Sequence, residues 1–122
     1  MVRNRRSTRK DLNIPVKGTV KIHKFKNEYI SDHNAFIQVE NISLNGLRFS
    51  SRLKFPVTKE LTVSMDFEIF GMKNQLVGTL AWKRKEMTNY VYGVEIVSAN
   101  MGYIQSVASL TKPDYKVTSG EQ

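Results

Sequence analysis

The sequence of 122 residues contains no cysteine, which excludes disulfide bonds, thiolate metal ligands and cysteine nucleophiles. It also contains no hydrophobic run that approaches the roughly 20 residues needed to cross a bilayer. No hydrophobic segment follows the basic N-terminus as it does in a secretory signal. The length is enough for one domain and too small for two of ordinary size. We therefore expect a single cytoplasmic domain that does not insert into a membrane.

The residues that catalysis or metal binding requires are scarce. The two histidines, His23 and His33, are far apart in the sequence, and there is no cysteine to join them in a metal site. Ser43 does not lie in a G-x-S-x-G motif, and Gly71 and Gly78 form neither a G-x-G-x-x-G motif nor a Walker loop. We therefore expect no catalytic residue, no bound metal and no cofactor, and we expect both histidines to lie at the surface.

Positive charge is concentrated at the N-terminus. The net charge of the chain is +8, and residues 1–10 carry five basic side chains and no acidic one. Such a cluster attracts phosphate groups over a Debye length, about 8–10 Å in ordinary salt. Taken alone, the cluster is also typical of a solvated basic tail or of a weak contact with nucleic acid. We call residues 1–10 the N-terminal arm and expect it to be flexible.

Most of the remaining chain alternates hydrophobic and polar residues with a period of two, which is typical of half-buried β-strands. Polar residues predict a loop over residues 27–34 and a turn over residues 41–46. Gly78 lies in the middle of a strand, where a bend, a bulge or close packing against a neighbour is expected. The expected strands cover residues 16–22, 35–40, 47–49, 60–70, 74–85 and 90–97.

One segment near the C-terminus has a helical period instead. Asn100 is suited to cap a short helix, and the tail over residues 113–122 is polar and expected to fray. Six strands in antiparallel succession, closed by one helix, predict an all-β fold over residues 11–112, a six-stranded antiparallel β-barrel with a short C-terminal helix. The helical residues expected to face inward are Met101, Ile104, Val107, Ala108 and Leu110.

Two polar segments combine residues that suit an anionic ligand. In the arm, Arg5 and Arg9 are four residues apart, and arginine binds phosphate with two parallel hydrogen bonds or stacks on a base. Arg6 and Lys10 have the same spacing, but lysine lacks the planar fork, so Arg6 is expected to play an auxiliary role.

The second segment, residues 41–46, offers side-chain and backbone groups between two strands. Asn41 can pair with a base edge, and Ser43 can bind a base or a phosphate oxygen. Gly46 permits a positive φ and a close approach of the backbone to a ligand. Ordinary β-turn chemistry would also explain this segment if it stood alone.

Together the two segments resemble the paired signature of the PilZ domain, R-x-x-x-R followed by [D/N]-x-S-x-x-G. Residues 5–110 fit that layout, and the stretches 77–82 and 92–96 look like late strands of the family. The resemblance implies a six-stranded β-barrel with a C-terminal helix and binding of the bacterial second messenger cyclic di-GMP. It implies that Arg5 and Arg9 hold phosphates and guanines, that Asn41 and Ser43 contact guanine and the ligand backbone, and that Gly46 keeps the turn tight.

The main hypothesis is a receptor without enzymatic activity, whose arm becomes ordered on ligand binding and which signals through an unidentified effector protein. Nucleic acid is not expected as a partner under this hypothesis. One alternative is a small β-barrel that binds single-stranded RNA or DNA through the arm and the aromatic residues Tyr90, Tyr92 and Trp82. Another is a structural adaptor that binds protein alone. The oligomeric state, the pathway and the number of ligand molecules per site are left open.

Overall fold

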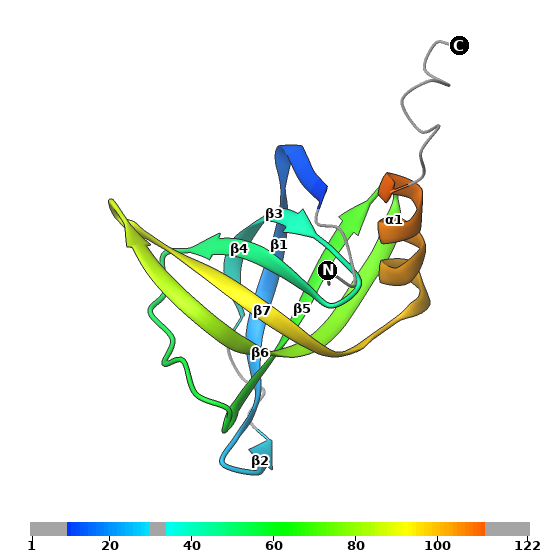
Figure 1. The fold of residues 1–122 in the computed structure, drawn as a ribbon. Helices are drawn as coiled ribbons and strands as arrows, with labels where there is room; N and C mark the ends of the chain where they lie inside the picture. Colours follow the sequence, from blue (N-terminus) through cyan, green and yellow to red (C-terminus); the bar gives the residue numbers. More distant parts are fainter. Residues whose placement is uncertain (1–9, 30–33, 112–122) are drawn as a thin grey trace, which may run out of the picture.

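The computed structural model describes residues 10–29 and 34–111 (Figure 1). No helix in these two ranges is long and apolar enough to cross a membrane. The arm that was expected to be flexible lies outside the described residues, apart from Lys10, and so does the tail that was expected to fray. The boundaries of the domain remain predictions. The elements are β1 (Lys10–Phe25), β2 (Glu28–Tyr29), β3 (Ala35–Ile42), β4 (Gly46–Ser51), β5 (Leu61–Ile69), β6 (Met72–Glu86), β7 (Asn89–Ala99) and α1 (Met101–Thr111).

Six of these strands form a closed antiparallel barrel. Their order around the barrel is β1-β3-β4-β7-β6-β5, and β1 pairs with β5 as well as with β3, which closes the sheet. β2 adds two residues beside the end of β1, within the stretch for which the sequence predicted a loop. The predicted all-β barrel of six strands with a short C-terminal helix is confirmed.

β1 begins at Lys10, earlier than the expected Val16. Its pairing with β3 is irregular between Asp11 and Val16, a stretch that contains Pro15. Proline has no backbone N–H to donate, so it is found at irregularities of this kind rather than in a continuous ladder. The irregular pairing interrupts the alternation of side chains, and this is why the pattern alone did not reveal the first part of the strand.

The barrel core follows the predicted alternation where pairing is regular. In β5 every second residue, from Leu61 to Ile69, is buried. Gly78 in β6 lies at a register shift, and a Cβ atom there would be 2.5 Å from the carbonyl oxygen of Glu95 and 2.7 Å from Cγ1 of Val94. The predicted bulge and close packing at Gly78 are therefore confirmed, and the position has no room for a side chain.

Helix α1 packs against β6 beside one end of the barrel (Figure 1). The side-chain oxygen of Asn100 accepts a hydrogen bond of 2.9 Å from the backbone N–H of Tyr103, which confirms the predicted cap. The residues of α1 that are buried are Tyr103, Ser106 and Val107. The predicted inward face was wrong for three residues, which are exposed: Met101, Ile104 and Ala108.

The difference between the predicted and the observed inward face of α1 has a physical reason. The hydroxyl group of Tyr103 is buried because it finds backbone carbonyl partners in the turn between β3 and β4. A tyrosine can be fully buried when its O–H group has such a partner. The prediction selected only aliphatic residues for the inward face, so it missed the aromatic residue that sets the rotation of the helix.

Tyr92 in β7 is a second tyrosine with no exposed surface. Its hydroxyl donates a hydrogen bond of 2.6 Å to the carbonyl oxygen of Leu53 and accepts one of 2.7 Å from the backbone N–H of Phe55. Burial raises the pKa of Tyr92, the hydrogen bond from Phe55 lowers it, and the neighbouring Tyr90 raises it further. The net direction is upward, so the folded protein keeps this proton to a higher pH than the unfolded chain.

We expect this tyrosine to make the protein sensitive to alkali. As the pH rises above about 10, the unfolded chain loses the Tyr92 proton first, and the free energy of unfolding falls. Tyr92→Phe removes the titrating group, so its thermal midpoint should fall less than that of the wild type between about pH 8 and pH 11. Equal slopes in thermal scans of the two proteins would contradict the assignment.

Candidate functional site

A tight turn joins β3 to β4, and we call residues 43–46 the Ser43 turn. The backbone N–H of Ser43 donates to the carbonyl oxygen of Gly46 at 2.8 Å, and the Ser43 hydroxyl donates to the same oxygen at 3.0 Å. The backbone N–H of Gly46 donates in return to the Ser43 hydroxyl at 3.1 Å. Ser43 is buried, so its hydroxyl closes the turn from within. Its predicted contact with a ligand stays a prediction.

Gly46 takes part in the Ser43 turn without the positive φ that glycine permits. Among the glycines in residues 10–29 and 34–111, only Gly71 has a positive φ, of 74°. Gly46 therefore does not use the left-handed conformation that glycine permits. It opens β4 and pairs with Glu95 of β7, and its backbone groups complete the hydrogen bonds of the Ser43 turn.

Asn41 belongs to the end of β3 and precedes the turn. A bulge lies between Val39 and Asn41, and Asn41 is paired with Arg48 of β4. The neighbouring pairs, Val39 with Phe49 and Ile42 with Leu47, have no exposed surface and face the core. Asn41 and Arg48 therefore lie on the outer side of the barrel, although only 4% of Asn41 is exposed.

The beginning of β1 lies directly beside this segment. Lys10 pairs with Ile42, and Asp11 pairs with Asn41. The first described residue after Arg9 is thus fixed next to the Ser43 turn. Arg5, Arg6 and Arg9 lie outside the described residues. The structure brings Asn41, Ser43 and Gly46 together and leaves the place of the three arginines a prediction.

The pairing of four strands creates a continuous row on the outer side of the barrel. Asn41 is paired with Arg48, Arg48 with Gly93, and Gly93 with Trp82. Gly93 has no side chain, and the indole ring of Trp82 occupies the space over it, because a Cβ atom at Gly93 would overlap that ring. We call Asn41, Arg48, Gly93 and Trp82 the outer row.

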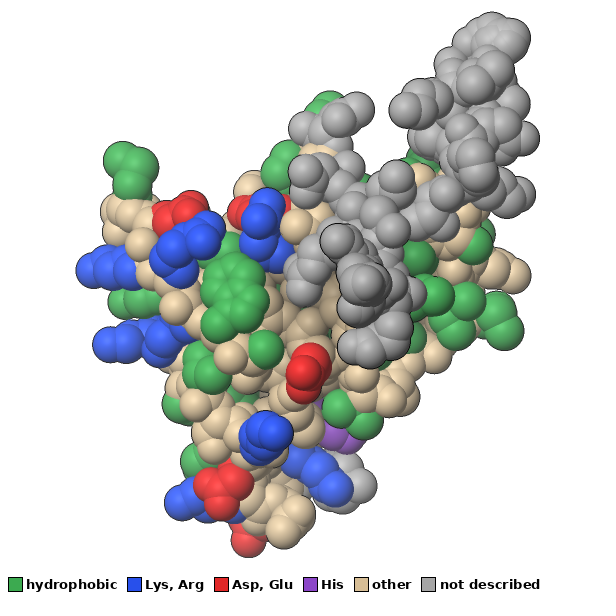
Figure 2. All heavy atoms as spheres, in the orientation of Figure 1, with side chains coloured by type: hydrophobic (Ala, Val, Ile, Leu, Met, Phe, Trp, Pro, Cys, Tyr) green, Lys and Arg blue, Asp and Glu red, His purple; other side chains and the backbone are tan. Residues whose placement is uncertain are grey.

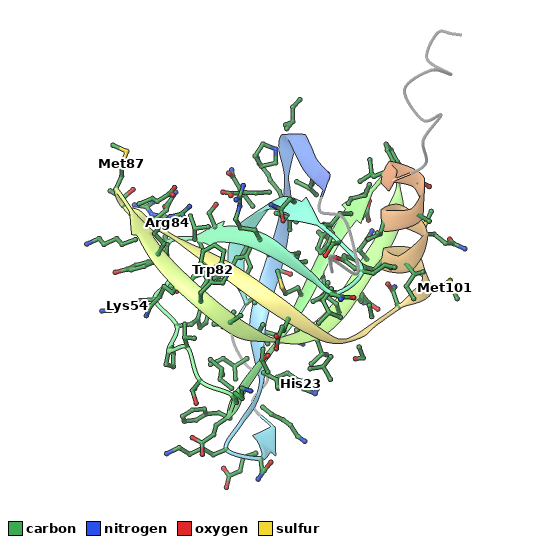
Figure 3. The ribbon with its side chains drawn as sticks, in the orientation of Figure 1. His23, Lys54, Trp82, Arg84, Met87 and Met101 are labelled. Carbon is green, nitrogen blue, oxygen red and sulfur yellow. The ribbon has the colours of Figure 1, made fainter. Side chains whose placement is uncertain are left out.

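Positively charged side chains lie near the aromatic ring of the outer row. The guanidinium carbon of Arg84 lies 5.6 Å from the ring centroid of Trp82. Figure 3 shows Trp82 and Arg84 near each other, and Figure 2 shows a hydrophobic patch on this face with Lys and Arg side chains beside it. Arg48 pairs with Glu40 at 2.9 Å, and Arg84 with Glu86 at 2.6 Å.

This arrangement suits a nucleotide. An indole ring and a guanidinium plane can each stack on a base, and guanidinium groups bind phosphate. Sequence analysis missed Arg48 and Arg84. The outward position of Arg48 between the buried Leu47 and Phe49 could have identified it, but its place beside Gly93 depends on the strand pairing.

The alternative of a nucleic-acid surface built on three aromatic residues is contradicted at one of them. Tyr92 has no exposed surface, so its ring is not available to a base. Tyr90 is half-buried, with the Nζ atom of Lys83 5.9 Å from its ring centroid. Trp82 remains on the outer side, where it is part of the outer row.

The described part of the chain holds no group of three or more His, Cys, Asp or Glu residues that could bind a metal ion. His23 is half-buried in β1, so the expected surface position holds in part, and His33 lies outside the described residues. The candidate site consists of the outer row and the Ser43 turn, whose groups offer stacking, hydrogen bonding and charge attraction.

Comparison with known proteins identifies the family of the chain. No curated protein matches the chain. The family model of the PilZ domain matches residues 3–112, a stretch that includes both signature motifs, all the described strands and helix α1. Domains of this family are, in general, binding modules for cyclic di-GMP and not enzymes. Because the match extends over nearly its whole length, the chain belongs to the PilZ domain family.

Proposed function

We propose that this protein is a cyclic di-GMP receptor in which the N-terminal arm closes over a ligand bound at the outer row and the Ser43 turn. One observation carries the proposal: β1 begins beside this site, with Lys10 paired to Ile42 and Asp11 paired to Asn41. Arg9 directly precedes Lys10 in the sequence, and for this reason the proposal assigns Arg9 to this site. Arg5 and Arg9 bind phosphates and guanines, and Arg6 assists them.

The physical chemistry of the ligand matches these residues. Cyclic di-GMP carries two phosphate charges, and the chain carries a net charge of +8. A hydrogen bond between a charged donor and a phosphate contributes roughly 1.5–3 kcal/mol when water is partly excluded. Several such bonds, together with stacking, support micromolar or tighter affinity after the cost of ordering the arm.

The outer row supplies the stacking surface. The indole ring of Trp82 occupies the space over Gly93, where no side chain intervenes. A base that stacks on such a ring gains about 1–3 kcal/mol. Arg48, on the other side of Gly93 in the row, offers a guanidinium group at the same level of the barrel. Asn41 and Ser43 then contact the guanine and the adjacent ligand backbone.

We attribute signalling to a change of the arm from a mobile to an ordered state. In the proposed mechanism the arm is mobile without ligand and becomes ordered when Arg5 and Arg9 bind it. The surface around the Ser43 turn changes as a result, and a cytoplasmic effector protein recognises the new surface. The charge concentration at residues 1–10 supports this proposal, because five basic side chains repel one another until an anion neutralises them.

Calorimetric titration of the whole chain with cyclic di-GMP tests the function. We expect a saturable exothermic signal with a Kd on the order of micromolar or below. The same titration is repeated with GTP, and again with a single-stranded oligonucleotide present at a concentration equal to that of the protein. A wild-type protein that shows no heat with cyclic di-GMP would contradict the proposal. An oligonucleotide that abolishes the signal in a salt-dependent way would favour the nucleic-acid alternative.

A further inference from the structure

Tyr103 connects helix α1 to the Ser43 turn from the core side. Its side chain has no exposed surface, and its hydroxyl donates a hydrogen bond of 2.6 Å to the carbonyl oxygen of Ser43. The same hydroxyl lies 3.3 Å from the carbonyl oxygen of Gly46. One side chain of the last element thus contacts both ends of a turn that is 57 to 60 residues earlier in the chain.

The Tyr103 hydroxyl gives the carbonyl group of Ser43 a hydrogen-bond partner. Ser43 is buried, and a buried carbonyl group without a hydrogen-bond partner is destabilising. The ring of Tyr103 is itself held in place, since it packs edge-on against Phe67 with a centroid distance of 6.1 Å. A third bond, from the N–H of Ile96 to the carbonyl oxygen of Asn45 at 2.9 Å, fixes the other side of the turn.

We propose that Tyr103 is a positioning residue of the cyclic di-GMP site, which holds the Ser43 turn in the conformation that binds the ligand. This inference rests on the function proposed above. Tyr103 does not touch the ligand, because it lies on the core side of the turn. The link works in both directions: a ligand that fixes the turn also stabilises the packing of α1, by the reciprocity of coupled equilibria.

The chain contains a matched control for this residue. Tyr92 is the other described tyrosine without exposed surface, and its hydroxyl also bonds to two backbone groups, at 2.6 and 2.7 Å. Those groups belong to Leu53 and Phe55, in the connection between β4 and β5 and outside the candidate site. Phenylalanine at either position keeps the ring and removes only the hydroxyl oxygen.

The experiment compares the whole wild-type chain with Tyr103→Phe and Tyr92→Phe. Thermal melting should show that both variants fold and that both lose a few degrees of stability, since each loses comparable hydrogen bonds. Calorimetry with cyclic di-GMP should show a Kd about fivefold to tenfold higher for Tyr103→Phe. For Tyr92→Phe the Kd should stay within about twofold of the wild type.

The outcomes separate this inference from the proposed function. If the wild type binds cyclic di-GMP and Tyr103→Phe binds it equally well, the positioning role is wrong. Equal weakening in the two variants also overturns it, because a general loss of stability would then suffice. If the wild type does not bind cyclic di-GMP, the proposed function fails. Amide hydrogen exchange then tests separately whether Tyr103 holds the Ser43 turn. Exchange at Ser43 and Gly46 should be faster in Tyr103→Phe alone, and unchanged exchange there would refute the link.

Discussion

Replacement of both Arg5 and Arg9 by alanine is expected to weaken cyclic di-GMP binding at least about hundredfold. Each guanidinium group is proposed to form charge-assisted hydrogen bonds with the ligand, and each such bond contributes roughly 1.5–3 kcal/mol. A loss of about 1.4 kcal/mol raises the Kd tenfold, so two lost groups account for the expected factor. Calorimetric titration of the double variant measures it.

Two controls separate the effect of the planar guanidinium group from the effect of its positive charge. Lysine at positions 5 and 9 keeps the charge and loses the planar fork, so the affinity should fall to an intermediate value. Alanine at Lys26 and Lys59 removes the same number of positive charges beside the end of β1 that is far from the Ser43 turn. That variant should bind within about twofold of the wild type, because screening limits charge effects at such distances. If it weakens binding as much as the loss of Arg5 and Arg9, net charge alone explains the affinity.

A large loss of stability is expected from Gly78→Ala. The new methyl group would be 2.5 Å from the carbonyl oxygen of Glu95, which is backbone and cannot rotate away, and 2.7 Å from a methyl group of Val94. The pairing between β6 and β7 must therefore shift. Overpacking of this kind costs about 1–3 kcal/mol, and the thermal midpoint should fall on the order of 5–15 °C.

A second glycine provides the control for this stability measurement. Gly71 adopts a φ of 74°, and nothing lies within 4 Å of the position that its Cβ would take. Asparagine tolerates the left-handed conformation better than other residues do, so Gly71→Asn should change the midpoint by no more than about 2 °C. A wild-type midpoint in Gly78→Ala would show that the β6–β7 pairing is less rigid than its contacts indicate.

The barrel was predictable because local pattern and global fold agree over most of its strands. In β5 the pattern of buried and exposed residues follows the period of two without interruption. Asn100 was predictable as a cap because its role depends on residues three positions away. Where a local pattern and the tertiary partner disagree, prediction failed. The inward position of Tyr103 depends on carbonyl groups in a distant turn, and no local pattern contains that information.

The residues of the candidate site likewise divide into those that the sequence could predict and those that it could not. The sequence motif located Asn41, Ser43 and Gly46, which are close together in the chain and remain so in the fold. The rest of the outer row joins β3, β4, β7 and β6, and register shifts lie in two of those pairings. A bulge moves every later residue of a strand by one position relative to its neighbour. The meeting of Arg48 and Trp82 at Gly93 therefore follows from the pairing of the strands and not from any spacing in the sequence.

The pairing of Lys10 with Ile42 makes the arm a short tether. Arg9 is the next residue along the chain from this anchor, and Arg5 can reach no more than roughly 17 Å from it. In the proposed receptor, a ligand bound at the outer row would meet the arginines at an effective concentration in the millimolar range or above. Binding then resembles chelation, in which the second set of contacts forms within the same molecule. In the proposed receptor, affinity depends on the length of this tether as well as on the contacts at its end, and the residue at which β1 begins sets that length.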